Sequence, residues 1–242
     1  MSENQAMTLD SGDQSAALAA MFEVGAHYGY TRSKRHPSVA PFIYGVKNQV
    51  EIFDLEKTIE LLSPALAFVA KIAGEGKQLL FVGTKHESQG VIREVAESID
   101  MPYVLTRWVG GTLTNFSTIR VRVERLGVLL AQRESGELAQ KYTKKERLMI
   151  DRDIVRLEKR FGGVTGMKEK PAALYIVDPK KEYTAVREAK QLGIPVIGLA
   201  GSDCDIKEVD FPIPANDSSR SSIYYFTRKV GDAYKYGHGG KV

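Results

Sequence analysis

The sequence predicts an α/β domain whose parallel sheet is covered by helices on both faces, with an inserted antiparallel hairpin of two long helices. Three observations lead to this fold class. Short apolar runs alternate with segments of helical periodicity along most of the chain, which is typical of a buried parallel sheet. The alternation stops between residues 112 and 168, where two helical patterns of matched spacing appear. A chain of 242 residues is long enough for one core and one projecting subdomain.

The N-terminal segment, residues 1–17, is predicted to be a disordered acidic tail. It consists mainly of small and polar residues, and the first 20 positions carry three acidic residues and no basic one. A segment of this kind buries too little apolar surface to offset the entropy lost on ordering. We therefore expect ordered structure to begin near Leu18.

The α/β domain is predicted to comprise residues 18–111 and 169–242. Val50–Phe53 has the composition of a short strand, and Asp54 is suited to cap the helix that follows. Pro64 lies inside the apolar pattern of that helix, so we expect a kink or a break there. Further apolar runs predict buried strands at Leu79–Val82, Tyr103–Leu105, Ala173–Val177 and Val196–Leu199.

The inserted segment, residues 112–168, is predicted to be a helical hairpin. Its two apolar seams have the same spacing of four, three and four residues, at Ile119, Val123, Leu126 and Leu130 and at Ile150, Ile154, Leu157 and Phe161. Thr143 and Glu146 have the spacing of a capping box at the start of the second helix, and Gly162-Gly163 marks its end. Gly136 falls in the turn. Two separate helices of the domain are the alternative, but the equal lengths favour a hairpin.

The charge of the chain is unevenly distributed. The net charge is +4 overall, but residues 114–168 carry thirteen Lys or Arg against seven Asp or Glu, a net of +6. Residues 1–20 carry −3, which leaves +1 for the remainder. Positive charge gathered in one segment is typical of a surface that binds a polyanion such as nucleic acid. The alternative is a solvated helix face with no partner.

The composition predicts a cytosolic protein. Cys204 is the only cysteine, which excludes an internal disulfide and a multi-cysteine metal site. No apolar run reaches the length needed to cross a bilayer, and the N-terminus has no signal-peptide pattern. We expect no membrane partner.

Motifs for catalysis or cofactor binding are missing from the sequence. Phe81–Lys85 joins a strand to a helix, but its single glycine fits neither a phosphate-binding P-loop nor a dinucleotide fingerprint. No two of the four histidines have the spacing of a helical zinc site, and no Gly-x-Ser-x-Gly elbow occurs. We expect no enzyme activity, no cofactor, no metal and no small-molecule substrate.

Two stretches have the composition of RNA-contacting segments. Tyr28–Tyr44 interleaves tyrosines with basic residues, so that cations can contact phosphates while rings stack on unpaired bases. Arg107–Phe116 contains the only tryptophan and the pair Gly110-Gly111, and it leads from a predicted strand into the hairpin. We interpret the glycine pair as a hinge that sets the direction of the hairpin.

At these motifs the sequence resembles the bacterial ribosomal protein S2 family of the small subunit. The resemblance runs from about Met21 to Phe226. It is carried by Gly25–Gly29, Pro41–Gly45, Phe81–Lys85, Arg107–Phe116, Thr143–Glu146, Leu192–Val196 and Val209–Asp217. It implies a flavodoxin-like domain of three layers with a five-stranded parallel sheet and a coiled-coil hairpin insertion. It also implies a structural role in translation as a constituent of the ribosome in the cytoplasm.

The partners implied by the resemblance are small-subunit rRNA, contacted at the junction of head and body on the solvent side, and neighbouring ribosomal proteins. These neighbours include the large mRNA-binding protein built of OB-fold repeats, where the family docks it. Together with the basic segments, the resemblance predicts the following RNA-binding residues: Arg32, Lys34, Arg35, Lys47, Lys85, Arg107, Trp108, Asn115, Arg120, Arg122, Arg125, Lys144, Lys145 and Arg147.

Three positions depart from the family pattern. Tyr30 stands where the family usually has a second histidine, Ser218 where it has the second of two aspartates, and Gly201 where it has an acidic residue. A metal seat built from these family positions would therefore have lost most of its ligands, and the surface that docks the mRNA-binding neighbour is put in doubt.

Two other classes of function remain as alternatives. A nucleotide- or cofactor-dependent enzyme on a doubly wound sheet should carry a glycine-rich phosphate loop, and none is present in the sequence. A coiled-coil adaptor outside the ribosome should have a hairpin of balanced charge rather than one of net +6.

Overall fold

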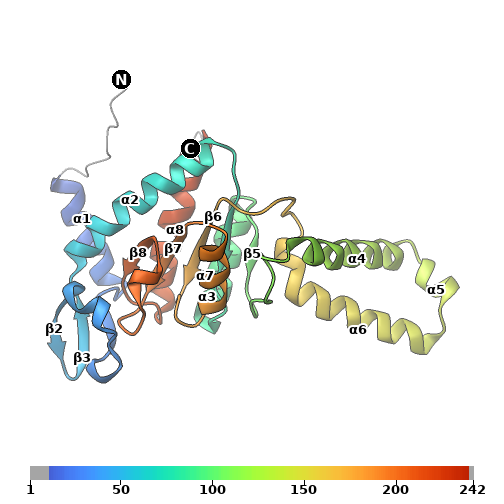
Figure 1. Ribbon diagram of the computed structural model, residues 1–242, viewed down its shortest axis with the longest axis horizontal. Coiled ribbons are helices and arrows are strands. Elements are labelled where there is room, and N and C mark those ends of the chain that lie inside the picture. Colours follow the sequence, from blue (N-terminus) through green and yellow to red (C-terminus); the bar gives the residue numbers. More distant parts are fainter. Residues whose placement is uncertain (1–10, 240–242) are drawn as a thin grey trace.

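The computed structural model describes residues 11–239, and its centre is a five-stranded parallel sheet (Figure 1). The strands are β4 (Leu79–Val82), β5 (Tyr103–Val104), β6 (Ala173–Val177), β7 (Val196–Ala200) and β8 (Phe211–Pro214). They lie in the order β5-β4-β6-β7-β8, which is 2-1-3-4-5 along the chain. This is the flavodoxin-like order, in which the strand order reverses between β4 and β6.

Helices cover both faces of this sheet. Alternate residues of one strand enter two different cores, as Leu79 and Phe81 pack on one face while Leu80 and Val82 pack on the other. The first face is covered by α2 (Leu55–Gly74), α3 (His86–Ser98) and α8 (Arg220–Gly237). The second face is covered by α7 (Tyr183–Gln191) and by the base of the inserted hairpin. The strands are fully buried for this reason, and their sequences are continuously apolar.

A second, antiparallel sheet stands beside the first. Its strands β1 (Tyr28–Thr31), β3 (Val50–Phe53) and β2 (Ile43–Lys47) lie in the order β1-β3-β2. The predicted strand at Val50–Phe53 therefore exists but does not belong to the parallel sheet. Its burial alternates along the strand, whereas β4 is buried throughout, because only one face of the small sheet meets the core.

The fifth parallel strand, β8, was not among the strands predicted from apolar runs. Its sequence, Phe-Pro-Ile-Pro, contains two prolines, which cannot donate to a central ladder. The strand lies at an edge of the sheet and pairs only with β7, where missing N–H groups are tolerated. The 3₁₀ segment η4 (Ile206–Glu208) precedes it.

The N-terminal helix α1 spans Ser11–Glu23, so the prediction of a disordered tail through residue 17 does not hold for residues 11–17. Residues 1–10 of that predicted tail lie outside the described residues. The alanine-rich sequence from Ala16 favours a helix, and Ala17 and Leu18 pack against the core beside α2. Propensity and packing together therefore extend the ordered chain further toward the N-terminus than composition alone indicated.

Helix α2 runs through Pro64 without ending, which corrects the predicted break. Its cap is as predicted, since the side chain of Asp54 accepts a hydrogen bond from the backbone N–H of Glu56 at 3.2 Å. Residues on both sides of the proline, Leu62 and Ala65, are buried against the sheet. We infer that this packing offsets the one backbone hydrogen bond that proline cannot donate.

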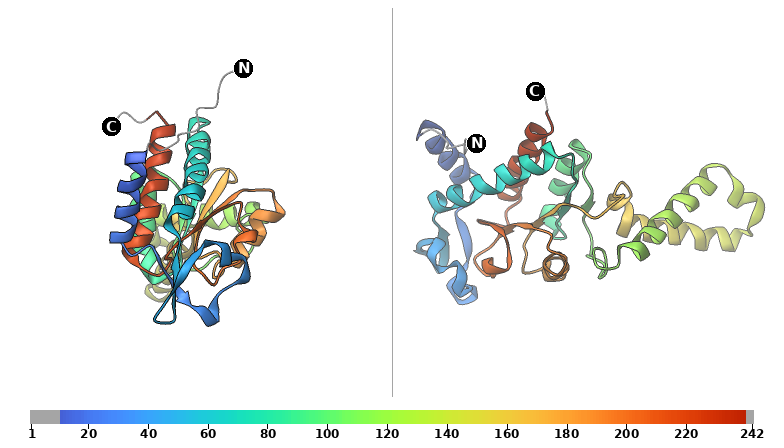
Figure 2. Two further views of the ribbon diagram at one scale, coloured as in Figure 1. Left: turned by 90° about the vertical axis from the view of Figure 1, so that its left-hand side faces the viewer. Right: turned by 45° about the horizontal axis from the view of Figure 1, so that its top comes forward.

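Between β5 and β6 the chain leaves the domain as a long projection, which we call the arm (Figures 1 and 2). The arm consists of α4 (Phe116–Glu134), the short helix α5 (Glu137–Lys141) and α6 (Lys144–Phe161). Helices α4 and α6 lie side by side and bury Ile119, Leu126, Ile154 and Phe161, which belong to the two predicted seams. The capping box of Thr143 and Glu146 is formed as predicted. In place of a simple turn at Gly136, α5 closes the tip.

The arm and the antiparallel sheet lie at opposite ends of the molecule (Figure 1). Among residues 11–239, no helix is both long enough and apolar enough to span a lipid bilayer.

Candidate nucleic-acid interface

The arm presents its basic side chains to solvent. Arg120, Arg122 and Arg125 are exposed on α4, and Lys144 and Lys145 are exposed at the start of α6. Arg147 is the exception among the predicted arm residues. It is half-buried, and its Nε has no hydrogen-bond partner in the part of the chain that the structure describes. Arg120 and Arg125 lie near surface carboxylates, those of Glu124 at 3.5 Å and Asp153 at 3.9 Å, whereas Arg122, Lys144 and Lys145 form no ion pair among residues 11–239.

The junction between the domain and the arm is organised by Glu188, a residue that sequence analysis missed. Its carboxylate accepts hydrogen bonds from the indole Nε1 of Trp108 at 3.0 Å and from three backbone N–H groups, those of Gly111, Leu113 and Thr114, at 2.8, 3.0 and 3.2 Å. The hydroxyl of Thr114 donates a further bond at 3.1 Å. One buried side chain of α7 therefore holds the whole segment that leads into α4.

The environment of Glu188 favours its ionised form. Burial by itself would raise the pKa of this carboxyl, but the hydrogen bonds from Trp108 and the backbone amides outweigh it, and the pKa lies below its ordinary value. A sequence signal for this role existed. Glu188 interrupts the apolar stripe of α7, between the buried Ala185 and Ala189, where a charge needs a partner.

Trp108, predicted to contact RNA, is turned into the protein instead. Its ring is buried in the core under the second face of the sheet, and its only N–H group is used by Glu188. It cannot stack on a base from this position. Arg107 and Asn115, its neighbours in the prediction, are exposed and remain available.

Each predicted glycine pair contains one position that needs glycine. Gly111 has a φ of +89°, whereas a side chain at Gly110 would meet nothing within 4 Å. At the other root of the arm, a Cβ on Gly163 would collide with the backbone carbonyl of Tyr103, whereas one on Gly162 would only touch Glu158 of the preceding helix α6. The left-handed backbone at Gly111 and the close approach at Gly163 are both unfavourable for residues with a Cβ.

The basic loop at the other end of the molecule has both free and occupied cations. Arg32 and Lys34 of η1 (Arg32–Lys34) are exposed, as is Lys47 at the end of β2. Arg35 instead approaches Glu51, with 3.3 Å between Nη1 and Oε1, and Glu51 is completely buried. Because Arg35 balances a buried carboxylate, only its exposed part can contact a partner.

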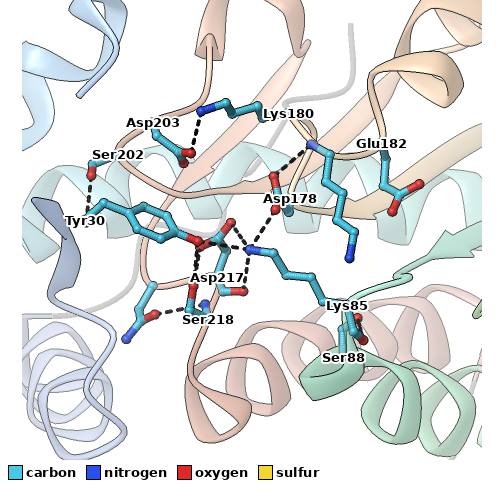
Figure 3. A network of polar contacts seen from close by, with 12 residues as sticks. Tyr30, Lys85, Ser88, Asp178, Lys180, Glu182, Ser202, Asp203, Asp217 and Ser218 are labelled. Carbon is cyan, nitrogen blue, oxygen red and sulfur yellow. Dashed lines mark hydrogen bonds and ion pairs between the residues drawn. The ribbon is translucent and has the colours of Figure 1, made fainter. Parts of the chain in front are cut away.

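Lys85, another predicted RNA contact, lies in a network of side chains at the carboxyl ends of the strands (Figure 3). Its Nζ lies 2.7 Å from Asp178 Oδ2 and 2.8 Å from Asp217 Oδ2, and it also donates to the hydroxyl of Tyr30 at 3.2 Å. These aspartates follow β6 and β8, so the fold brings them to the same edge as Lys85, which follows β4. Two carboxylates occupy the ammonium group, and Lys85 is corrected from an RNA contact to a structural ion pair.

Burial and charge act against each other in this network. Burial alone would lower the pKa of Lys85, but Asp217 and Asp178 raise it above its ordinary value. Burial raises the pKa of Asp217, and the nearby charge of Lys85 opposes that effect. The charged form of Lys85 is therefore stabilised by the two aspartates, and the charged form of Asp217 is stabilised by Lys85.

The three positions that depart from the family pattern meet beside this cluster. The hydroxyl groups of Tyr30 and Ser218 are 2.6 Å apart, and a Cβ on Gly201 would lie 2.8 Å from both the Tyr30 ring and an Asp217 oxygen. The ring of Tyr30 thus lies where an acidic side chain at 201 would be directed. Across residues 11–239, no three His, Cys, Asp or Glu side chains are arranged to hold a metal ion.

Comparison with known proteins gives a consistent result. The family model described as "Ribosomal protein S2" matches residues 21–237. The chain belongs to the ribosomal protein S2 family. It is 44% identical over 224 residues to a protein named small ribosomal subunit protein uS2 from Coprothermobacter proteolyticus, which covers 93% of this chain and 83% of that one. Proteins of the same name from Geotalea uraniireducens and Chloroherpeton thalassium are 42% and 43% identical, over 88% and 89% of this chain and 83% and 86% of their own lengths.

Ribosomal protein S2 is a structural family, so membership identifies the chain as a structural protein and not an enzyme. The resemblance inferred from short motifs is confirmed, and so is the flavodoxin-like parallel sheet. No comparison tests the RNA-binding residues one by one. They stay predictions, apart from the two that the structure turns inward.

Proposed function

We propose that this protein is a structural constituent of the small ribosomal subunit and that it binds small-subunit rRNA, at the junction of head and body on the solvent side. It acts in the cytoplasm, within the ribosome, and supports translation. The observation that carries this proposal is the projecting basic arm in a chain whose relatives are named as small-subunit proteins. Phosphate recognition needs exposed cations on a rigid support, and the arm provides both.

The α/β domain, residues 18–111 and 169–242, and the hairpin, residues 112–168, divide the work in this proposal. The domain supplies a second basic site through its N-terminal loop, at the end opposite to the arm. The candidates for RNA contact are the exposed members of the predicted set: Arg32, Lys34, Lys47, Arg107, Asn115, Arg120, Arg122, Arg125, Lys144 and Lys145. Those on the arm lie on both of its sides, so a single RNA surface can meet only some of them. Arg35 and Arg147 can offer only their accessible parts. Neighbouring small-subunit proteins are further partners, among them the large mRNA-binding protein of OB-fold repeats.

Co-sedimentation tests the proposal. The native protein is expected to sediment with the small subunit at low salt and to be released by high salt, because phosphate contacts weaken steeply as counterions are added. The control is a variant that keeps the α/β domain but has a short glycine linker in place of residues 116–161 of the arm. It is expected to lose most of its retention. If the native protein sediments free of the small subunit at low salt, the proposed function is refuted.

A further inference from the structure

The basic residues of the arm are not spread evenly around it. An α-helix has 3.6 residues per turn, so residues three or four apart are neighbours and residues two apart point in nearly opposite directions. On α4, Arg122 and Arg125 are neighbours by this rule, while Arg120 lies about 200° around the helix from Arg122. The buried seam residues Ile119 and Leu126 separate the two sides. The arm therefore has two different flanks.

An ion pair shows which residues of α6 share the flank of Arg125. Asp153 Oδ2 lies 3.9 Å from Arg125 on α4, and Asp153 Oδ1 lies 2.7 Å from Arg156 on its own helix. Arg125 and Arg156 therefore lie on the same side of the hairpin. Arg152 and Arg160 are each about one helical turn from Arg156 on α6, and Lys145 lies about three turns before it. On α4, Arg133 lies about three turns beyond Arg122.

We call this side the arginine flank. Its basic residues are Arg122, Arg125, Arg133, Lys145, Arg152, Arg156 and Arg160, and all seven are exposed. Its acidic residues are Asp153, which is paired within the flank, and Glu146, which is used in the capping box. Helical periodicity places Arg120, Lys144 and Arg147 on the other flank, together with Glu124, Glu134, Asp151 and Glu158. Seven bases against two acids gives +5 on one flank, and three against four gives −1 on the other.

We infer that the arginine flank alone is the RNA-binding surface of the arm, and that it contacts the phosphate backbone of structured RNA. Arg120, Lys144 and Arg147 lie on the opposite flank and are thereby excluded from the contacts. This inference rests on the proposed function. Six of the seven cations are arginines, whose planar guanidinium groups bind phosphate oxygens in a bidentate manner. They extend over roughly 20 Å of helix, at 1.5 Å per residue, which suits a row of successive phosphates. The opposite flank would repel that backbone.

Two double variants test which flank binds. Arg122 and Arg133 form no ion pair among residues 11–239, so R122Q/R133Q removes two charges without breaking an internal contact. The matched control is R120Q/K144Q, which also removes one charge near the root of the arm and one near its tip. Both variants have the same net charge, so that any general electrostatic attraction falls equally. Circular dichroism and thermal unfolding verify that both are folded.

The measurement is binding of the full-length variants to purified small-subunit rRNA over a range of salt concentrations. R122Q/R133Q is expected to bind at least tenfold more weakly near 0.1 M salt. The slope of log K against log salt should fall by about 1.4 to 1.8, since each of the two lost phosphate contacts removes about 0.7 to 0.9. The control R120Q/K144Q should stay within about twofold of the native protein, with a slope changed by less than one.

Other outcomes contradict the inference in distinguishable ways. Equal losses in both variants would mean that net charge alone matters, and an unchanged R122Q/R133Q would mean that the arginine flank does not meet RNA. Normal affinity for naked rRNA combined with poor retention in assembled subunits would assign the flank to an acidic protein neighbour. If the native protein itself binds no small-subunit rRNA, the proposed function fails instead of the choice of flank.

Discussion

Two ionised groups that are largely removed from solvent are stabilised in opposite ways in this protein. Lys85, at the carboxyl edge of the sheet, is balanced by the full charges of Asp178 and Asp217. Glu188, at the root of the arm, forms no ion pair among residues 11–239 and is stabilised by the N–H groups of Trp108 and of a loop. In the first case, ion pairs connect the residues that follow β4, β6 and β8. In the second, a single carboxylate gives a flexible glycine-containing segment one conformation.

The comparison teaches that a buried charge is not a sign of a binding site. A basic residue after a glycine, as in Gly83-Thr84-Lys85, looks like an anion cradle in the sequence, but the anions that occupy it here come from the same chain. An acidic residue on the apolar stripe of a helix looks like an error in the pattern, yet Glu188 positions the arm. The role of a buried charged side chain is therefore decided by the groups that it contacts, and not by its charge alone.

The largest expected effect is that of Lys85→Met. The variant leaves Asp178 and Asp217, with side chains 12% and 1% exposed, without a counter-charge. Removing one partner from a buried ion pair costs about 3 to 5 kcal/mol of unfolding free energy. Urea unfolding at neutral pH measures it. Because burial raises the pKa of Asp217, this loss should shrink as the pH falls and the carboxyl becomes neutral.

Lys180→Met serves as the control for that measurement. Lys180 lies 2.7 Å from Asp203 but is 55% exposed, so its loss should cost less than about 1 kcal/mol. If Lys85→Met and Lys180→Met have equal effects, the cluster at the sheet edge does not stabilise the fold as argued.

Glu188→Gln is expected to have an intermediate effect, about 2 kcal/mol, because hydrogen bonds to a charged acceptor become bonds to a neutral one. The amide also turns an N–H₂ group toward backbone donors. Unfolding free energies measure the loss, and retention in the small subunit reports the direction of the arm. Glu208→Gln is the matched control, since Glu208 pairs with Lys190 at the surface and should tolerate the change.

The pH dependence of the Glu188 effect has a definite sign. The folded pKa of Glu188 lies below its ordinary value, so the ionised group stabilises the fold at pH values above the ordinary glutamate pKa. That stabilisation is lost as the pH falls through the lowered folded pKa. The difference in stability between the native protein and Glu188→Gln should therefore be constant near neutrality and decrease in acid. A difference that grows in acid would contradict the assignment.

Gly111→Ala is expected to have the smallest effect, about 1 to 2 kcal/mol, because a residue with a Cβ is strained at the φ of +89° found there. Gly110→Ala, one position earlier, should be nearly neutral, since its Cβ would meet nothing within 4 Å. The amide of Gly111 donates to Glu188, so the strain should also weaken that contact. If the two variants have equal stability and equal retention in the subunit, Gly111 does not help to position the arm.

Several features of this protein were determined by the sequence alone. The seams at Ile119 to Leu130 and at Ile150 to Phe161 predicted two paired helices, and the capping box at Thr143 predicted where the second begins. The order of short motifs predicted the family. These signals are local, because side-chain periodicity and capping depend on residues within a few positions of one another.

Only the tertiary structure decided which charged residues are free to bind. Lys85 and Asp217 are 132 positions apart, and Trp108 and Glu188 are 80 apart, so no local pattern could reveal that each meets its partner. The same holds for Val50–Phe53, whose sequence predicts a strand but not which of the two sheets contains it. The identity of a partner depends on chain topology, which brings distant strand ends together, and a buried charge must be compensated wherever the fold places it.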